Sequence, residues 1–287
     1  LRRGAEVTLE ANPEDITPAA VHAWSEAGIN RLSIGVQSFD DRVLAWMHRS
    51  HDAVDAKRAV ATARDGGIEN VSIDLIFAVP SNLNRDWRRD VEQALELRLP
   101  HLSVYGLTVE PRTPLGRWVA RHETVEAPED SFESEFLLAH QAITSAELDH
   151  YEVSNYGFPG RHSRHNWSYW HREPYAGLGP SAHEFDGVER RWNTEAFSTW
   201  ESLATAGRDT LAGSETLDDE QERAEQAYLS LRANEGLKAT DEQLAQVARW
   251  VQSGWATIIG GVIRLTANGW LRLDALASDL TLLRSRY

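Results

Sequence analysis

Apolar and polar residues alternate along four short stretches within the first 110 residues of the chain. The clearest stretch runs from Arg31 to Gln37, where Leu32, Ile34 and Val36 occupy every second position. A period of two residues is typical of a β-strand with one apolar face and one polar face. The same alternation recurs in three other stretches, at residues 7–11, 71–75 and 102–106.

Helical patterns separate these predicted strands, at residues 18–27, 40–66 and 85–97. Strands separated by helices pair in parallel through right-handed crossovers, whereas antiparallel hairpins need no helix between them. We therefore expect an α/β fold in which the apolar strand faces contact the helices. An antiparallel sheet with its polar face in water would alternate just as cleanly and is the competing interpretation. In the parallel arrangement the polar faces share one interior, into which Glu10, Gln37 and Asp74 would point.

The ends of the predicted strands suit a ligand site. Gly28 follows a helical pattern and fits the position after a helix C-terminus, where a positive φ is required. Gln37 and Ser38 close the second predicted strand, and parallel barrels build their active sites at the C-terminal ends of strands. A polar interior differs from the packed apolar interior of a closed barrel. It predicts an open barrel that holds a sizeable polar ligand.

The pattern changes in the second half of the chain. Residues 127–148 form a long helical pattern with an apolar stripe, and a short extended segment follows at 151–156. Residues 157–200 show weak periodicity and are rich in Gly, Pro, His, Arg, Trp and Tyr, which is typical of functional or mobile segments. The sequence therefore predicts a barrel domain at 1–150, an irregular connecting segment at 151–215 and a C-terminal domain at 216–287.

The C-terminal domain shows a winged-helix-like order of elements. Helical patterns are predicted at 218–232, 240–253 and 267–276, with a hairpin at 255–265 that turns at two glycines. Thr240 and Gln243 have the spacing of a capping box at the start of the second helix. Winged-helix domains often bind DNA, but the second helix carries Asp241, Glu242 and only one arginine. We expect a small accessory domain that covers one mouth of the barrel.

Composition narrows the class of protein. The chain has 287 residues and a formal net charge of −15 at pH 7, which disfavours nucleic acid and anionic membrane surfaces as main partners. No apolar run reaches transmembrane length and no signal peptide opens the chain, so a cytoplasmic protein is expected. Peripheral membrane contact stays open. The absence of cysteine excludes disulfides and thiolate metal sites in this chain.

Three motifs carry a resemblance to a known family. They are Leu9–Pro13 (LEANP), Gly35–Phe39 (GVQSF) and Asp74–Ile76 (DLI), and their spacing fits as well. Together they are similar to the radical S-adenosylmethionine (SAM) enzymes of the oxygen-independent coproporphyrinogen III oxidase type. The resemblance covers nearly the whole chain and is greatest to the haem chaperone, or HemW-like, branch. It implies a partial, open TIM-like (β/α) barrel of parallel strands, followed by a small α+β winged-helix-like domain.

The resemblance also implies SAM as a ligand of the barrel. Glu10 matches a contact to the SAM at the iron–sulfur cluster, and Gln37, Arg49 and Asp74 match contacts to a second SAM in the oxidases. Thr108 aligns with a further, mainly backbone contact. These residue types suit a zwitterionic nucleoside, because a guanidinium clamps a carboxylate and carboxylates accept from ammonium and hydroxyl groups. The competing interpretation is a buried Arg49–Asp74 ion pair with Glu10 in solvent.

One part of the family pattern is missing from this sequence. Radical SAM families hold a [4Fe–4S] cluster with a CxxxCxxC motif after the first strand, and a Gly-rich SAM-binding segment follows the second. The sequence contains neither and starts directly before what would be the family's third strand. We expect a fragment that lacks the N-terminal portion, with a natural paralogue that lost the cluster as the alternative. This chain alone should then not cleave SAM reductively, and its status as an enzyme stays open.

The segment His165–Trp170 (HNWSYW) resembles the HNxxYW motif of the haem chaperone branch. The resemblance implies haem binding through His165, Asn166, Tyr169 and Trp170. Imidazole is a good axial ligand for haem iron, so His165 is the expected iron ligand. The competing interpretation is a histidine that only makes hydrogen bonds in an aromatic segment. Other candidate groups are the possible ligands His162, His171 and His183, and the possible propionate partners Arg161, Arg164 and Arg172.

The expected function is that of a haem chaperone that binds haem and delivers it to acceptor proteins. One alternative is a coproporphyrinogen III oxidase, in which a 5′-deoxyadenosyl radical abstracts hydrogen from propionate side chains before they become vinyl groups. The other is a cluster-free module that binds SAM or haem. The sequence departs from the family pattern at Ala78 and Ser181, where glycine is usual, and at Ser163, where many relatives have cysteine.

Overall fold

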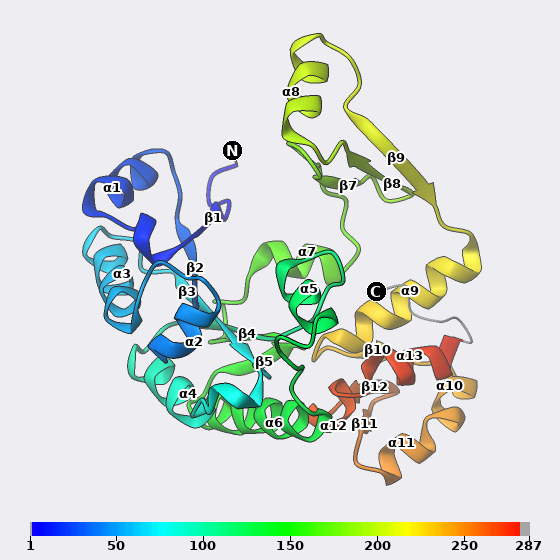
Figure 1. The fold of residues 1–287 in the computed structure, drawn as a ribbon. Coiled ribbons are helices and arrows are strands. Elements are labelled where there is room, and N and C mark those ends of the chain that lie inside the picture. The colour runs from blue at the N-terminus through cyan, green and yellow to red at the C-terminus, as the bar shows by residue number, and fades with distance from the viewer. Residues whose placement is uncertain (1, 282–287) are drawn as a thin grey trace. The chain divides into compact units, whose positions relative to one another are not determined.

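The computed structural model describes residues 2–281 and divides into two compact units (Figure 1). The division falls between His162 and Ser163. The first unit contains a six-stranded sheet with its helices, and the second contains two three-stranded sheets with theirs. Within residues 2–281, no helix is both long enough and apolar enough to cross a membrane.

Four parallel strands form the centre of the first unit. The sheet has the order β1-β2-β3-β4-β6-β5, and β1 to β4 pair in parallel, so the antiparallel interpretation is wrong. An antiparallel hairpin, β5 and β6, adds to the edge of β4. The strands are β1 (Thr8–Ala11), β2 (Arg31–Gln37), β3 (Val71–Phe77), β4 (His101–Gly106), β5 (Asp149–Glu152) and β6 (Asn155–Gly157).

Helices α1 to α4 begin within two residues of the predicted helical patterns, and a capping residue marks each start. Helix α5 was not predicted. Thr17, Asp40, Asp52 and Asp86 each accept a hydrogen bond from a backbone N–H of the helix that follows. Gly28 has φ +92° just after the first helix, as expected. The helices are α1 (Pro18–Glu26), α2 (Asp41–Trp46), α3 (Ala53–Asp65), α4 (Trp87–Glu96), α5 (Pro114–Ala120) and α6 (Glu129–Ser145), with short 3₁₀ turns at Pro13–Asp15 and Ser81–Leu83.

The core of the first unit lies between the sheet and α1, α3, α4 and α6, which run along its outer face (Figure 1). The apolar positions of the alternating pattern are buried there, including Leu32, Ile34 and Ile73 at 0% exposure. Burying each such side chain contributes about 1.5–3 kcal/mol relative to leaving it exposed. The opposite face of the sheet carries the polar positions. Because the two faces differ in this way, the register of each strand is strongly specified.

The second unit is built from shorter elements. Gly260 and Gly261 both have positive φ and close the predicted hairpin between β11 and β12. Its helices are α7 (Arg164–Trp170), α8 (Phe197–Thr205), α9 (Asp219–Arg232), α10 (Asp241–Gln246), α11 (Ala248–Gln252), α12 (Ala267–Trp270) and α13 (Leu273–Thr281). Its strands are β7 (His183–Phe185), β8 (Glu189–Asn193), β9 (Leu211–Thr216), β10 (Leu237–Lys238), β11 (Ala256–Ile259) and β12 (Val262–Leu265).

The structure corrects the expectation of an irregular segment at 151–215. That range contains the β5–β6 hairpin end, α7, the antiparallel sheet β7-β8-β9 and α8. Every residue of β8 is half-buried, so the two faces of the strand do not differ in burial. Its sequence therefore shows no alternation of apolar and polar residues. The helical pattern at 240–253 also forms two helices instead of one, with the break at Val247, although the predicted capping box of Thr240 is present.

Candidate functional site

The second strand ends in a strained turn at Gln37. The backbone N–H of Ser38 donates to the carbonyl of Val36 at 2.9 Å, which closes a three-residue turn around Gln37. Gln37 has φ +67°, a conformation that is rare and strained for a residue with a side chain. Strain of this kind clusters at functional sites. The turn ends the pairing of β2 at the edge where the site was expected.

Gly35 leaves room for two of the predicted ligand-binding side chains. A Cβ atom on Gly35 would lie 2.8 Å from Nε2 of Gln37 and 2.9 Å from a guanidinium nitrogen of Arg49. The same nitrogen of Arg49 donates to the Gly35 carbonyl at 2.7 Å and to Oδ1 of Asn12 at 3.1 Å. Arg49 lies in the joint between α2 and α3, so it ties that joint to β2 and to the loop after β1. The amide and the guanidinium therefore lie together over the polar face of β2.

Asp74 lies on the same face, on the neighbouring strand β3. Its Oδ1 accepts a hydrogen bond of 3.1 Å from the hydroxyl of Ser33, and Ser103 on β4 also hydrogen-bonds to it. Burial raises the pKa of the Asp74 carboxyl, and the nearby negative charge of Glu10 raises it further, while the two serines lower it. Glu10 on β1 is exposed and pairs in register with Ser33.

The four predicted SAM contacts Glu10, Gln37, Arg49 and Asp74 thus gather on one face of β1 to β3. Within the described residues, Arg49 and Asp74 do not form an ion pair, so the competing interpretation fails on that point. Thr108, implied by the family resemblance as a further, mainly backbone contact, follows β4 (His101–Gly106) and stays a prediction. It is exposed beyond the end of β4, and its hydroxyl donates to the Gly106 carbonyl at 3.5 Å.

The polar face continues across β4 with residues that the sequence reasoning did not single out. His101 contacts Ser72 at 2.7 Å and the Tyr151 hydroxyl at 2.8 Å through its two ring nitrogens. Burial lowers the pKa of His101 well below its usual value, with the charge of Arg31 as the second cause. Burial and the charge of Asp74 raise the pKa of Tyr105 to about 12. The sequence could have indicated both residues, because His101 and Tyr105 occupy polar positions of the two-residue alternation along β4.

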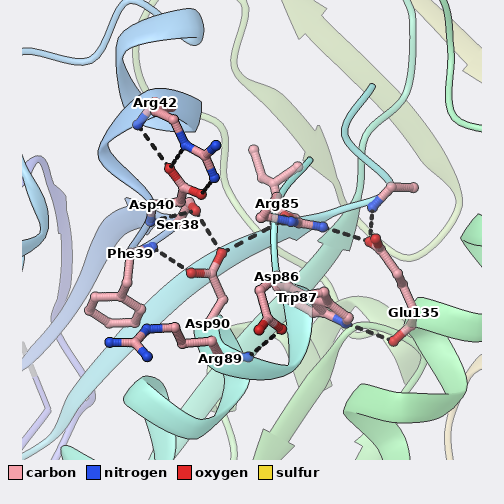
Figure 2. Close-up of polar contacts among 12 residues, drawn as sticks. Ser38, Phe39, Asp40, Arg42, Arg85, Asp86, Trp87, Arg89, Asp90 and Glu135 are labelled. Carbon is pink, nitrogen blue, oxygen red and sulfur yellow. Dashed lines mark hydrogen bonds and ion pairs between the residues drawn. The ribbon is translucent and has the colours of Figure 1, made fainter. Parts of the chain in front are cut away.

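A buried charged network contacts Ser38 and Phe39, the two residues that follow Gln37 (Figure 2). Asp90 on α4, 2% exposed, accepts from the Ser38 hydroxyl at 2.6 Å and from the Phe39 N–H at 2.9 Å. Arg85 lies 3.8 Å from Asp90 and 2.6 Å from Glu135 on α6. Burial raises the pKa of Asp90 and lowers that of Arg85, and their ion pairs oppose both shifts.

In the second unit, the HNWSYW segment forms helix α7. Ser163 caps this helix by accepting from the Asn166 N–H at 3.4 Å. His165 is exposed, and its ring lies edge-on to Tyr169 with 4.7 Å between centroids. Trp170 is half-buried beneath the guanidinium of Arg232, 4.6 Å from the ring centroid. The helix therefore leaves one imidazole accessible beside an aromatic surface.

A cavity of about 290 Å³ adjoins this helix. Its aromatic walls include Tyr169, Trp170, Tyr175, Phe185 and Tyr228. Arg172 and Arg190 also line it, and both bind the carboxylate of Glu225. An aromatic cavity with buried charges suits a flat ligand with polar groups.

Some of the other candidate haem groups already have partners in the structure. Arg172 binds Glu222 at 2.6 Å and Glu225 at 2.7 Å, so it does not lie free for a propionate as expected. His171 contacts Glu235 at 2.9 Å. Among the remaining candidates, His162 stacks on Tyr151 in the first unit and His183 stacks on Trp192 in the second, and Arg161 and Arg164 are exposed.

Comparisons with known proteins identify the family. A model of the radical SAM superfamily matches residues 1–94. The haem chaperone HemW of Mycobacterium tuberculosis is 33% identical over 281 residues, which cover 96% of this chain and 72% of that protein. The chain belongs to the HemW family of radical SAM proteins. Another relative, the haem chaperone HemW of Escherichia coli, is 38% identical over 183 residues, 64% of this chain and 47% of that protein.

The fold agrees with this family. A solved structure of coproporphyrinogen III oxidase (HemN) from Escherichia coli, a radical SAM enzyme, matches with a TM-score of 0.75. The match covers 96% of this chain and 70% of that chain at 19% sequence identity, so the likeness shows the fold alone. The partial barrel of parallel strands expected from the sequence is thereby confirmed.

The radical SAM family implies SAM and a [4Fe–4S] cluster, and the residues present fit these two groups differently. SAM fits the donor set, because an amide and a guanidinium lie together over Gly35, and Arg49 Nε is buried without a hydrogen-bond partner among the described residues. The chain has no cysteine and therefore offers no thiolate to a cluster. In residues 2–281, no group of three His, Asp or Glu side chains is placed to hold a metal ion.

Proposed function

We propose that this chain binds SAM on the polar face of β1 to β3, binds haem beside α7, and acts as a haem chaperone that delivers haem to acceptor proteins. The observation that carries the proposal is the gathering of Gln37 and Arg49 over Gly35, next to Asp74. The names of the HemW relatives support the haem part. We also infer that the protein works in the cytoplasm.

The polar face offers each part of SAM a complementary group. The Arg49 guanidinium suits the SAM carboxylate, because it donates several hydrogen bonds in a planar fork. Glu10 and Asp74 suit the ammonium group and the ribose hydroxyls, which donate to carboxylates. The Gln37 amide both donates and accepts, which suits an adenine edge. When bound, SAM would supply a methionine and a nucleoside to this face, and the residues of this chain would hold and orient it.

The haem part of the proposal uses the exposed imidazole of α7. His165 would bind the iron, because its ring is exposed whereas His171 contacts a carboxylate. Tyr169 and Trp170 would give flat contact area to the porphyrin beside the aromatic cavity. Asn166, one turn before Trp170 on α7, completes the motif.

Titration of the 287-residue chain with haem tests this part. His165→Ala should shift or abolish the Soret band of the bound haem and weaken its binding. His22→Ala is the matched control, because His22 is an exposed histidine on α1 that is not among the candidate ligands. An unchanged spectrum and affinity in His165→Ala would assign the iron to another ligand.

Calorimetric titration with SAM tests the other part. Arg49→Ala and Asp74→Ala should each weaken SAM binding by about tenfold or more, since each loses a hydrogen bond to a charged group. Arg58→Ala on the exposed side of α3 is the control, because Arg58 pairs only with Asp55 among the described residues. Unchanged affinity in both site variants would remove the SAM assignment.

A further inference from the structure

The conformation of Gln37 is costly and needs support from outside β2. A φ of +67° is unfavourable for any residue with a Cβ atom, and the turn is closed by one backbone hydrogen bond, from Ser38 to Val36. If the turn relaxed to an extended conformation, the Gln37 side chain would leave its place over Gly35. The surrounding structure must therefore hold the residues that follow Gln37.

Asp90 holds those residues with both of its carboxylate oxygens. Oδ2 accepts from the Ser38 hydroxyl at 2.6 Å, and Oδ1 accepts from the Phe39 N–H at 2.9 Å. The Ser38 hydroxyl oxygen also accepts from the Asp40 N–H at 3.1 Å, just before α2 begins. One carboxylate thus fixes the chain on the C-terminal side of the strained turn (Figure 2).

Asp90 is itself held in place by a wider network. Arg85 reaches it at 3.8 Å and donates to the Ile76 carbonyl of β3 at 2.6 Å. The other end of the Arg85 guanidinium binds Glu135 on α6, which also accepts from the Ala78 N–H at 2.7 Å. The turn is therefore tied to a second strand and to two helices (Figure 2).

We propose that Asp90 is a positioning residue for SAM binding, which acts by holding the strained turn that places the Gln37 amide over Gly35. The inference rests on the proposed SAM site. Asp90 is 2% exposed and its oxygens are engaged by Ser38 and Phe39, so it acts through Gln37 and not on the ligand. The charge of Arg85 keeps the carboxylate in its hydrogen-bonding form.

The first measurement is the SAM affinity of Asp90→Asn in the full chain. Asparagine has the same shape, but it keeps only one acceptor oxygen and turns an NH₂ group toward a donor. We expect SAM affinity to fall about three- to tenfold, the effect of misplacing one hydrogen-bonding side chain. Val91→Ala, at a fully buried apolar neighbour on α4, is the matched control, because it loosens the same helix and removes none of the hydrogen bonds of Asp90. Its SAM affinity should be unchanged.

A double-mutant cycle with Gln37→Ala separates positioning from general loss of stability. If Asp90 acts through Gln37, Asp90→Asn should cost no further affinity once residue 37 is alanine. If the two effects add, or if Asp90→Asn binds SAM like the wild type, the positioning role is wrong and the SAM site stands. If Asp90→Asn fails to fold, Ser38→Ala replaces it, because this variant removes the hydrogen bond from the Ser38 hydroxyl to Asp90. Ser38→Ala must then weaken SAM binding, and it must cause no further loss of affinity when combined with Gln37→Ala.

The controls distinguish this inference from the proposed function on which it rests. If Gln37→Ala binds SAM as well as the wild type, or if the wild type binds no SAM, both the proposed SAM site and the positioning role of Asp90 are wrong. If Gln37→Ala weakens binding and Asp90→Asn does not, only the positioning role is overturned.

Discussion

The guanidinium of Arg49 donates a hydrogen bond of 2.7 Å to the carbonyl oxygen of Gly35. This contact crosses from the α2–α3 joint to the middle of β2, and it lies beside the amide of Gln37. It is possible because residue 35 has no side chain on the polar face. A single missing methyl group therefore makes room for two of the four proposed SAM contacts.

Gly35→Ala should weaken SAM binding while leaving the fold intact. The new methyl would meet Gln37 and Arg49 at under 3.0 Å, and the ends of both flexible side chains would move away. We expect about tenfold weaker binding by calorimetry and a change in unfolding free energy within about 1 kcal/mol. Ala61→Ser, on the exposed face of α3, should change neither quantity. Wild-type affinity in Gly35→Ala would show that SAM does not use these side chains.

Asp74→Asn should bind SAM more weakly than the wild type and should be more stable at pH 7. Burial raises the pKa of Asp74, so its charge opposes folding at pH 7, and an amide of the same shape removes that charge. We expect a free energy of unfolding about 1 kcal/mol higher at pH 7, with weaker SAM binding. The wild type should gain stability relative to the variant as pH falls from 7 toward 4, because its folded state binds a proton more readily than the unfolded state.

The pH dependence predicted for Asp74 is checked by urea unfolding of both proteins at several pH values. A stability difference that does not change with pH would mean that the carboxyl titrates alike in the folded and unfolded states. A less stable Asp74→Asn would mean that the hydrogen bonds from Ser33 and Ser103 outweigh the cost of burial.

Ser181→Gly should stabilise the second unit. Ser181 and Ala78 both have φ +57°, a left-handed conformation that glycine adopts without strain, which accounts for the glycine usual in the family at both positions. Ser181 is exposed, so its removal costs little packing. We expect about 1 kcal/mol of added stability, measured by thermal unfolding. Ser202→Gly, within α8, should do the opposite by about 0.5 kcal/mol. Destabilisation by Ser181→Gly would contradict the strain argument.

Acid should destabilise the first unit through its buried histidines. Burial holds the pKa values of His101 and His150 well below the usual value of about 6.5. Their contribution to stability is fully present above pH 6.5 and is lost as pH falls, because the unfolded chain takes up protons first. Each should cost up to about 1.4 kcal/mol per pH unit below 6.5.

Unfolding free energies at pH 7.5 and 5.5 measure this effect. His101→Gln should show a smaller loss between the two pH values than the wild type. His22→Gln should show the wild-type loss, because the His22 side chain is exposed on α1. Equal pH dependence in all three proteins would contradict the assignment to His101.

Strands β1 to β4 and the helices between them could be predicted because their signals are local. The alternation of Arg31–Gln37 sets both the strand and its buried face, and Asp40 and Asp52 mark helix starts through bonds to residues two or three positions away. The β7-β8-β9 sheet gave no such signal, since β8 has no face that is more buried than the other. The β5–β6 hairpin was hidden for a related reason, because its strands have only four and three residues.

Part of the candidate site could be predicted from the sequence, and part of it could not. Glu10, Gln37 and Asp74 were expected on one polar face, because a two-residue period assigns every second side chain to the same side. Thr108 came instead from the family resemblance, and it lies beyond the end of β4, outside the alternating pattern. The network behind the site was not foreseen, because Ser38 and Asp90 are 52 positions apart and no local pattern joins them.

The sequence by itself determined which residues form β1 to β4 and the helices between them, and which face of those strands is polar. The reason is that the two-residue period and the helix caps depend on residues that are close together in the chain. Only the tertiary structure decided that Arg49 lies over Gly35 and that Asp90 accepts hydrogen bonds from Ser38 and Phe39. Those contacts depend on how α2, α4 and α6 pack against the sheet, and packing brings together side chains that are distant in the sequence.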